Sequence, residues 1–297
     1  MKAAERGFLL LTSSLGDPDR HPLTTAQVRK LFQRSESMKR QERSRDVDVH
    51  DLTSIGYSAG QAKHIVDLLC DEALLEYYLM KARRADCVPL TRATEGYPLI
   101  LRKRLGMECP GVLWAKGDLT LLETPMVALV GSRDLGEENR RFAAETGRQA
   151  ALQGYTLVSG NARGADRTAQ NACLEAGGKV VIVVADSLEE KKPGEQMLYL
   201  SEDSFDAEFS AQRALSRNRC IHALGLKTFV AQTRAGAGGT WDGTVKNLQN
   251  GWSQVFGFRD GSEGMARLEQ MGAELIDADA LGSFYDLPAP ELNLFDR

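Results

Sequence analysis

The sequence has 297 residues, 42% of them hydrophobic, and a formal net charge of −4 at pH 7, values of an ordinary globular protein with a substantial core. This acidic balance excludes nucleic-acid binding by bulk charge, so any nucleic-acid site must be a local patch. The five cysteines include no C-x-x-C pair, which argues against a disulfide framework or a zinc site and favours a reducing compartment, the cytoplasm.

Residues 1–95 carry no strand-like pattern and predict a small helical N-terminal module. One helix is expected to start at Thr24 or Thr25, with threonine as its cap, and an apolar helix is expected over 65–79. The apolar run near the N-terminus is too short to cross a membrane, and no cleavage signal follows it. Seven Lys or Arg against two Glu give residues 29–45 a net charge of +5. This basic stretch is either a solvated face or a binding surface.

Apolar runs alternate with helical patterns through residues 96–284. This alternation predicts an α/β domain, an extended Rossmann-like parallel sheet with helices on both faces. Ligands of such sheets bind outside the carboxyl ends of the strands, so the loops after the strands deserve most weight. The expected strands are 126–130, 155–158, 179–184, 227–230, 255–258 and 273–276, after a short apolar run at 112–115, and the expected helices are 137–153, 165–176, 206–223, 241–251 and 263–271.

Two strand-end loops combine glycine with arginine. Gly131, Ser132 and Arg133 follow the first core strand and offer close backbone approach, a hydroxyl and a planar guanidinium. The next loop, 159–166, opens a helix, whose first amides form an anion site. Here Arg163 adds charge, and Asp166 is expected either to cap the helix or to hold Arg163. Each loop by itself is also consistent with a plain turn. The candidate residues of the second loop are Ser159, Gly160, Arg163, Gly164 and Asp166.

Two further segments carry candidate phosphate ligands. Arg217, Asn218 and Arg219 fall within the helix expected from about residue 206. Because residues two apart do not share a helical face, one arginine is expected to face the cleft and the other a carboxylate. The loop 233–240 is glycine-rich but lacks the Gly-Lys-Ser/Thr of a P-loop, which disfavours magnesium-dependent phosphoryl transfer. Its candidate residues are Gly236, Gly238, Gly239 and Thr240, and Trp241 is the aromatic side chain expected to stack on bases.

The order of these motifs resembles the DprA/Smf family of DNA-processing proteins over roughly residues 95–280. Gly131-Ser132-Arg133 matches that family's first signature, and Arg217-Asn218-Arg219 matches its Arg-Asn-Arg. Its Ser-Gly-x-Ala-x-Gly-x-Asp pattern is matched within 159–166. Two departures are Gln170, where a histidine is usual, and Gly257-Phe258, where Pro-Gly is usual. No C-terminal winged helix is expected.

The resemblance implies a cytoplasmic protein that binds single-stranded DNA through phosphates, without a cofactor, a metal or catalysis. It also implies a homodimer and a RecA-type recombinase as partner, with a role in recombination or natural transformation. The departures from the family pattern argue against transformation and suit a divergent relative in a phage, a mobile element or a defence system. Two alternatives stay open. One is a nucleotide sensor or phosphoribohydrolase, for which Asp242 stands near the place of the catalytic glutamate. The other is a protein-interaction adaptor in which the sheet is only a scaffold.

Residues 285–297 predict an extended C-terminal tail, because two prolines there oppose a helix. The segment Glu291-Leu292-Asn293-Leu294-Phe295 resembles a peptide that docks on the bacterial sliding clamp, with glutamate in place of the usual glutamine. Leu292, Leu294 and Phe295 would be the apolar anchors in the clamp's pocket. The other interpretation is a tail folded back on its own core.

Overall fold

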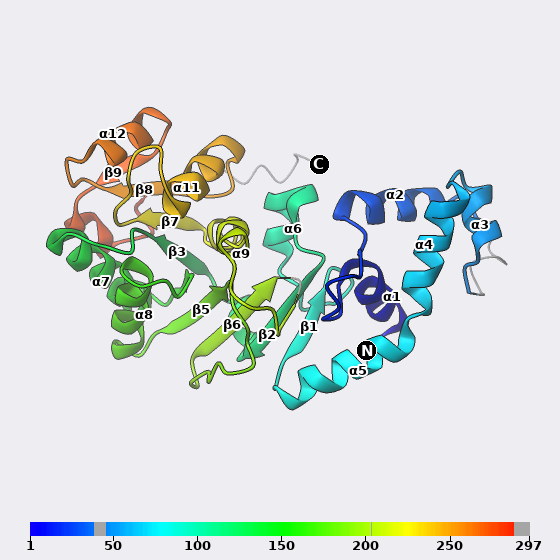
Figure 1. The fold of residues 1–297 in the computed structure, drawn as a ribbon. Helices are drawn as coiled ribbons and strands as arrows, with labels where there is room; N and C mark the ends of the chain where they lie inside the picture. The colour runs from blue at the N-terminus through cyan, green and yellow to red at the C-terminus, as the bar shows by residue number, and fades with distance from the viewer. Residues whose placement is uncertain (39–45, 203, 288–297) are drawn as a thin grey trace.

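The N-terminal module is helical and packs beside one end of a long sheet (Figure 1). The computed structural model describes residues 1–38, 46–202 and 204–287. Within these ranges no helix is both long and apolar enough to cross a bilayer. The module contains α1 (Ala3–Thr12), α2 (Thr25–Ser35), α3 (Val49–Ser54), α4 (Ala59–Cys70) and α5 (Glu72–Arg84).

Nine strands form a single mixed sheet in the order β1-β2-β6-β5-β4-β3-β7-β8-β9. Strands β3 to β9 run parallel, and β1 and β2 are antiparallel additions at one edge. From β3 the chain moves outward through β4, β5 and β6 on one side and through β7, β8 and β9 on the other. The strand order therefore reverses beside β3, the place where such sheets bind ligands. The strands are β1 (Val88–Thr91), β2 (Val112–Gly117), β3 (Met126–Val130), β4 (Thr156–Ser159), β5 (Lys179–Val184), β6 (Met197–Glu202), β7 (Lys227–Val230), β8 (Gln254–Phe258) and β9 (Glu274–Ile276).

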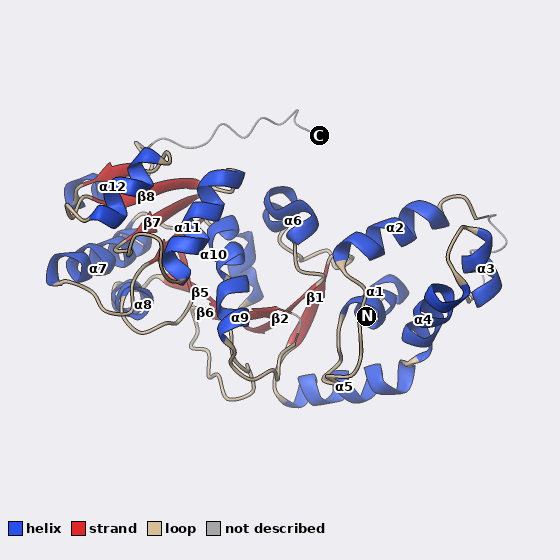
Figure 2. Cartoon of the chain, turned by 45° about the horizontal axis from the view of Figure 1, so that its top comes forward, coloured by secondary structure: helices blue, strands red, loops and turns tan. Residues whose placement is uncertain are grey.

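Helices cover both faces of the sheet, as Figure 2 shows. Side chains alternate along β3, so that Val127 and Leu129 join the core under α7 and α8, while Ala128 and Val130 join the core on the opposite face. The opposite core takes in residues of α6, α10, α11 and α12. These helices are α6 (Leu99–Leu105), α7 (Glu137–Leu152), α8 (Ala165–Glu175), α9 (Ala211–Ser216), α10 (Asn218–Leu224), α11 (Gly239–Asn250) and α12 (Glu263–Gln270).

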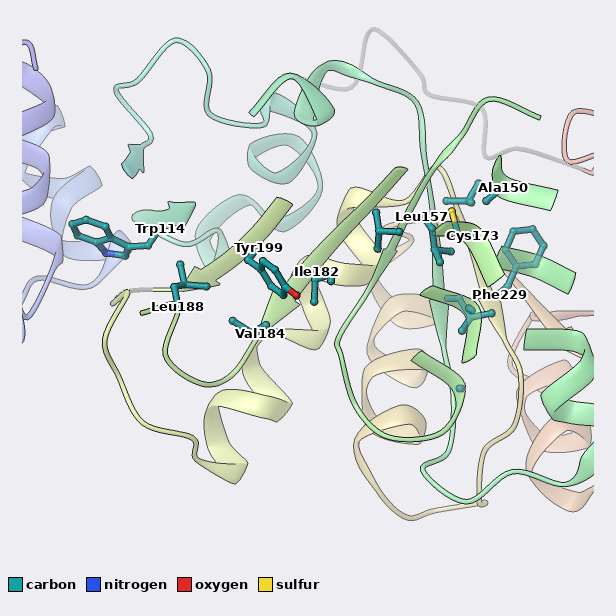
Figure 3. Packing of buried hydrophobic residues seen from close by; sticks show 14 of the residues in the cluster. Trp114, Ala150, Leu157, Cys173, Ile182, Val184, Leu188, Tyr199 and Phe229 are labelled. Atoms are coloured by element: carbon teal, nitrogen blue, oxygen red, sulfur yellow. The ribbon is translucent and has the colours of Figure 1, made fainter. Parts of the chain in front are cut away.

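The module and the sheet share one hydrophobic core. Tyr78 of α5 meets Trp114 of β2 edge to face, with 5.3 Å between the ring centroids, and Phe205 packs against both rings. Figure 3 shows this core extending along the sheet from Trp114 to Phe229. The α5 helix therefore stabilises the segment that follows β6, which carries one wall of the site described below.

The expected fold class, a Rossmann-like sheet after a helical module, is confirmed, but three elements differ from the prediction. Strand β1 begins at Val88, within the stretch predicted to be helical. Strand β6 was not expected, because a segment containing Pro193 and Gly194, without a helix, joins it to β5. The helix predicted over 206–223 is two shorter helices: Ser210 caps α9, and Arg217 separates α9 from α10.

Candidate nucleic-acid interface

A cleft of about 600 Å³ lies at the carboxyl ends of β3, β4 and β7, next to the reversal of strand order. We call it the strand-end cleft. Four segments far apart in the sequence supply its walls: the loops after β3, β4 and β7, and the segment 209–218 that contains α9. Its lining residues are Val130, Gly131, Ser132, Arg133, Asp134, Ala162, Asp166, Phe209, Ala211, Ala214, Leu215, Arg217, Asn218, Gln232, Thr233, Arg234, Ala237, Gly238, Gly239 and Thr240.

The loop after β3 is tied to the loop after β7. The backbone N–H and the hydroxyl of Ser132 both donate to the carbonyl oxygen of Gln232, at 2.9 and 3.2 Å. A Cβ on Gly131 would lie 2.5 Å from the Cβ of Ala165, so glycine is required for α8 to approach. Arg133 is exposed, and among the described residues it has no ion-pair partner. Its guanidinium is therefore available to an anion in the cleft.

Asp166 organises the loop after β4. Its Oδ2 accepts hydrogen bonds from the N–H groups of Gly160 and Ala162, both at 3.1 Å. Burial raises the pKa of this carboxyl, whereas nearby Arg217 and the two amides oppose the rise. The sequence-based roles for Asp166 were wrong. It does not cap α8, which begins at Gly164, and Arg163 pairs with Asp134 instead, at 2.7 Å.

Arg217 lies under the cleft, between α9 and α10. Its Nη2 donates to the carbonyl oxygen of Gly160 at 2.9 Å and lies 4.0 Å from Oδ2 of Asp166. A Cβ on Gly160 would overlap the guanidinium, so this glycine makes room for it. Burial lowers the pKa of Arg217, and its Nε is buried with no partner within the described ranges. The arginine thus holds the loop after β4 while its buried Nε–H has no acceptor.

Arg219 points away from the cleft, as its two-residue spacing from Arg217 predicts. Its Nη2 pairs with Glu202 at 2.9 Å, and its Nε donates to the carbonyl oxygen of Glu108 at 2.9 Å. One arginine of the motif therefore faces the cleft and the other a carboxylate. Between them, Asn218 donates from Nδ2 to the carbonyl oxygen of Gly239 at 2.9 Å and fixes the start of α11 against α10.

Helix α11 directs its first turn at the cleft. Its N-cap is Gly238, which makes no side-chain cap hydrogen bond, and Gly238, Gly239 and Thr240 all line the cleft. The first amides of a helix lack intrahelical partners and carry a partial positive charge. Arg234 lies in the same loop, exposed. This combination of open amides with a guanidinium suits an anionic oxygen.

The structure does not place every candidate residue in the cleft lining. Ser159 is buried and accepts a hydrogen bond from Gln170, the residue that replaces the usual histidine. Gly160 and Gly164 lie outside the lining. Because they have no Cβ, the guanidinium of Arg217 can approach Gly160, and the carbonyl oxygens of Ser132 and Arg133 can approach Gly164. The candidates within the lining are Gly131, Ser132, Arg133, Asp166, Arg217, Asn218, Gly238, Gly239 and Thr240; those outside it are Ser159, Gly160, Arg163, Gly164, Arg219 and Gly236. Leu292, Leu294 and Phe295 lie outside the described residues.

Sequence reasoning chose the wrong aromatic side chain. Trp241 is 8% exposed and packs in the core, so it offers no free ring face to the cleft. Phe209, 60% exposed, lines the cleft together with Leu215, 50% exposed. Phe209 was missed because its segment was predicted to belong to the helix 206–223, whereas the structure has it before α9. Arg234 was also missed, although it lies in the glycine-rich loop already singled out.

The described residues contain no group of three His, Cys, Asp or Glu side chains placed to hold a metal ion. All five cysteines are free thiols, and four of them are buried.

Comparison with known proteins identifies a family. The family model of DNA recombination-mediator protein A matches residues 89–281. The chain is 30% identical to the DNA processing protein DprA of Streptococcus pneumoniae over 192 residues, which are 60% of this chain and 68% of that protein. It is also 30% identical to the protein Smf of Escherichia coli over 186 residues, 56% of this chain and 48% of that protein. The match thus spans about two thirds of the first relative and about half of the second.

Two solved structures share the fold. The X-ray structure of DprA from Streptococcus pneumoniae has a TM-score of 0.71 at 24% identity, and the match covers 94% of this chain and 97% of that one. DNA processing protein A from Helicobacter pylori has a TM-score of 0.54 at 23% identity, with coverage of 65% and 93%. Since the family model also covers more than half of the sequence, the chain belongs to the DNA recombination-mediator protein A family, the DprA/Smf family of DNA-processing proteins.

Proposed function

We propose that the strand-end cleft binds the phosphate backbone of single-stranded DNA without reading its sequence. The observation that carries this proposal is that the uncapped start of α11 and the side chains of Arg133 and Arg234 line one cleft. Helix-start amides and guanidiniums are groups that proteins use to hold phosphate. The Helicobacter pylori relative supports the same ligand, because its structure was described for its single-stranded DNA binding mode.

The composition of the cleft favours a strand over a free phosphate. Besides the amides and guanidiniums, Phe209 and Leu215 expose apolar surface to the cleft. A single strand offers both phosphates and flat base faces, which match this mixture of polar and apolar groups. Contacts of this kind fix position and do not distinguish bases, so binding is expected to be tolerant of sequence and sensitive to salt.

A nucleotide-sensing or hydrolytic role is the alternative. Asp242, which stands near the place of a catalytic glutamate in the sequence, lines a neighbouring hollow rather than the strand-end cleft. The carboxylates in the cleft lining are Asp134, paired with Arg163, and Asp166, which accepts two backbone amides. Both are engaged in holding the loops, so we propose binding rather than catalysis.

The test is the double substitution Arg133→Gln and Arg234→Gln, with Arg148→Gln as the control. Arg148 is a surface arginine of α7 that pairs with Glu145. Fluorescence anisotropy of a labelled oligonucleotide is measured at several salt concentrations. Loss of two phosphate contacts is expected to weaken binding about tenfold and to lower the slope of log affinity against log salt by about 1.4.

Unchanged affinity and salt slope in the double variant would reject the cleft as the DNA site. Tighter binding of a nucleoside monophosphate than of the oligonucleotide would favour the sensor, and release of free base from it would favour the hydrolase. If neither the oligonucleotide nor the nucleotide binds, the result would favour the protein-interaction adaptor, in which the sheet is only a scaffold.

The protein partners remain proposals. We propose a homodimer and a RecA-type recombinase as partners, on the strength of the family resemblance. Docking on the sliding clamp rests on the tail sequence alone. Lys227 donates from Nζ to the carbonyl oxygens of Phe284 and Leu287, so a truncation should retain Leu287. If the chain ending there binds the clamp as well as the full chain does, the clamp proposal is wrong.

A further inference from the structure

Two helices outside the strand-end cleft carry three basic residues each and no acidic residue. They are α2, with Arg29, Lys30 and Arg34, and α6, with Arg102, Lys103 and Arg104. Among the helices of eight or more residues in the described part of the chain, α2 alone contains no Asp or Glu, and among the shorter ones α6 carries three basic residues where α9 and α10 carry one Arg each. The whole chain has 41 acidic against 37 basic residues, so this concentration of positive charge runs against its composition.

Helix α2 contacts the segment that follows α6, although the sequence separates them. The Thr25 hydroxyl donates to the carbonyl oxygen of Cys109 at 3.2 Å, and Nη1 of Arg29 lies 3.5 Å from Sδ of Met107. Both Met107 and Cys109 come directly after α6, and Figures 1 and 2 show α2 and α6 on the same side of the molecule. The backbone N–H of Arg92 donates to the carbonyl oxygen of Gly111 at 3.3 Å, and Nε of Arg219 donates to that of Glu108 at 2.9 Å. Both arginines therefore contact the short segment 108–111, which follows α6.

Some of these cations already have structural partners. Arg34 donates to the carbonyl oxygen of Gly56 at 2.7 Å and stacks on the ring of Tyr57. Arg104 donates to the carbonyl oxygen of Ala223 at 3.0 Å. By contrast, Arg29 and Arg102 are exposed and Arg92 is half-buried, and none of the three has an ion-pair partner in the part of the chain that is described. We call Arg29, Arg92 and Arg102 the module basic surface.

A second hollow, of about 520 Å³, lies beside the strand-end cleft, on the side of the segment that α2 contacts. It shares Leu215 with the cleft and extends to Glu108, which adjoins Met107. Its charged lining is balanced, with Arg219 and Lys246 against Glu108 and Asp242. A polyanion that follows this path therefore passes from one positive region, across a neutral one, to another.

We propose that the module basic surface binds phosphates of the same DNA strand that occupies the strand-end cleft, so that the site continues through the second hollow onto the N-terminal module. This inference rests on the proposed function. Unpaired guanidiniums suit phosphates because they offer several fixed donors and keep their charge. Since a single strand carries one phosphate at every nucleotide, only a strand longer than the cleft can reach both regions.

The test compares oligonucleotides of about 4 and about 16 nucleotides, which bracket the usual site sizes of single-strand binding domains. The variant is Arg29→Gln with Arg102→Gln. The matched control is Arg83→Gln with Arg84→Gln, which removes the same charge from two exposed arginines of α5. We expect the first pair to weaken binding of the long oligonucleotide about tenfold and leave the short one unchanged, because two phosphate contacts are lost.

The lysine variant, Arg29→Lys with Arg102→Lys, keeps the charge and should recover most of the long-strand affinity. Equal effects of the two glutamine pairs would overturn the inference, because bulk charge would then explain them. The inference is also wrong if the wild-type protein binds both oligonucleotides equally well and the Arg29→Gln, Arg102→Gln variant binds them as the wild type does. Failure of the wild-type protein to bind either oligonucleotide would instead reject the proposed function itself. Circular dichroism of each variant confirms that it is folded.

Discussion

The starts of the helices differ between the N-terminal module and the strand-end cleft. In the module, α2, α3 and α4 begin at Thr24, Asp48 and Ser58, and each of these side chains accepts a hydrogen bond from an amide of the first turn within a capping box. Around the cleft, α7, α8 and α11 begin at glycines, without a side-chain cap. The first-turn amides are thus satisfied by side chains in these module helices, whereas α11 directs amides without a side-chain cap at the cleft.

The two kinds of helix start serve different ends: a side-chain cap stabilises its helix, whereas a glycine cap leaves the helix start able to bind an anion. A side-chain cap contributes about 1 kcal/mol to the stability of its helix and occupies an amide that an anion would otherwise use. A glycine cap forgoes that stability but leaves the positive end of the helix accessible and lets another backbone or a ligand approach. We therefore expect substitutions at the starts of α3 and α4 to alter stability alone, and those at the cleft to alter stability and DNA binding together.

The largest effect is expected from Gly164→Ala at the start of α8. Gly164 has φ +89°, and a Cβ there would overlap the carbonyl oxygens of Ser132 and Arg133. Because backbone and not side chain must move, the free energy of unfolding should fall by about 3 kcal/mol, with loss of DNA affinity. Urea unfolding and anisotropy measure the two effects. Gly60→Ala in α4, where no atom lies within 4 Å of the new Cβ, is the control and should not destabilise.

His222 should make stability depend on pH. It is buried in α10, where Asn247 lies 3.1 Å from its Nδ1, and burial lowers its pKa to about 3. A histidine in the unfolded chain has a pKa of about 6.5. Between about pH 3 and about pH 6.5, therefore, only the unfolded chain binds this proton. The free energy of unfolding should therefore fall as pH falls, by about 1.4 kcal/mol per unit and by about 2 kcal/mol at pH 5.

Urea unfolding at pH 7.5 and pH 5 measures this dependence, and the His222→Gln variant should lose most of it. His64, which is exposed on α4, is the matched position in the module, so His64→Gln should leave the dependence as it is in the wild type. If both variants retain the wild-type slope, another group controls the acid stability.

The smallest effect is expected from Ser58→Ala at the start of α4. Its hydroxyl accepts the N–H of Gln61 at 3.3 Å, so its removal should lower the free energy of unfolding by about 1 kcal/mol. DNA affinity should stay at the wild-type value, because this cap is far along the chain from the cleft and serves only its own helix. A drop in affinity with intact folding would contradict the separation of stability from binding.

Local patterns in the sequence predicted much of the sheet and of the site. The run Met126–Val130 is a strand as predicted, and the helices after it and after β4 start and end within a few residues of their predicted bounds. Gly131-Ser132-Arg133 and the glycines at 238 and 239 were expected to meet, because carboxyl ends of parallel strands share an edge. The strand-end cleft confirms that geometry.

Other features depend on contacts between distant segments. The break at Arg217 follows from the buried position of its guanidinium against Gly160 and Asp166, which no local pattern encodes. Whether Trp241 or Phe209 is exposed depends on which helix face meets the core. Likewise, the packing of Tyr78 on Trp114 joins the module to the sheet through side chains that are simply apolar in the sequence.

By itself, the sequence determined the α/β class, most strand and helix positions, and the loops that carry arginine and glycine, because periodicity and turn chemistry act over a few residues. Only the tertiary structure decided which arginine faces the cleft, that the start of α11 points into it, and that α2 contacts the segment after α6. These outcomes depend on how buried faces pack and how charges are partnered, and packing joins residues that the chain keeps far apart.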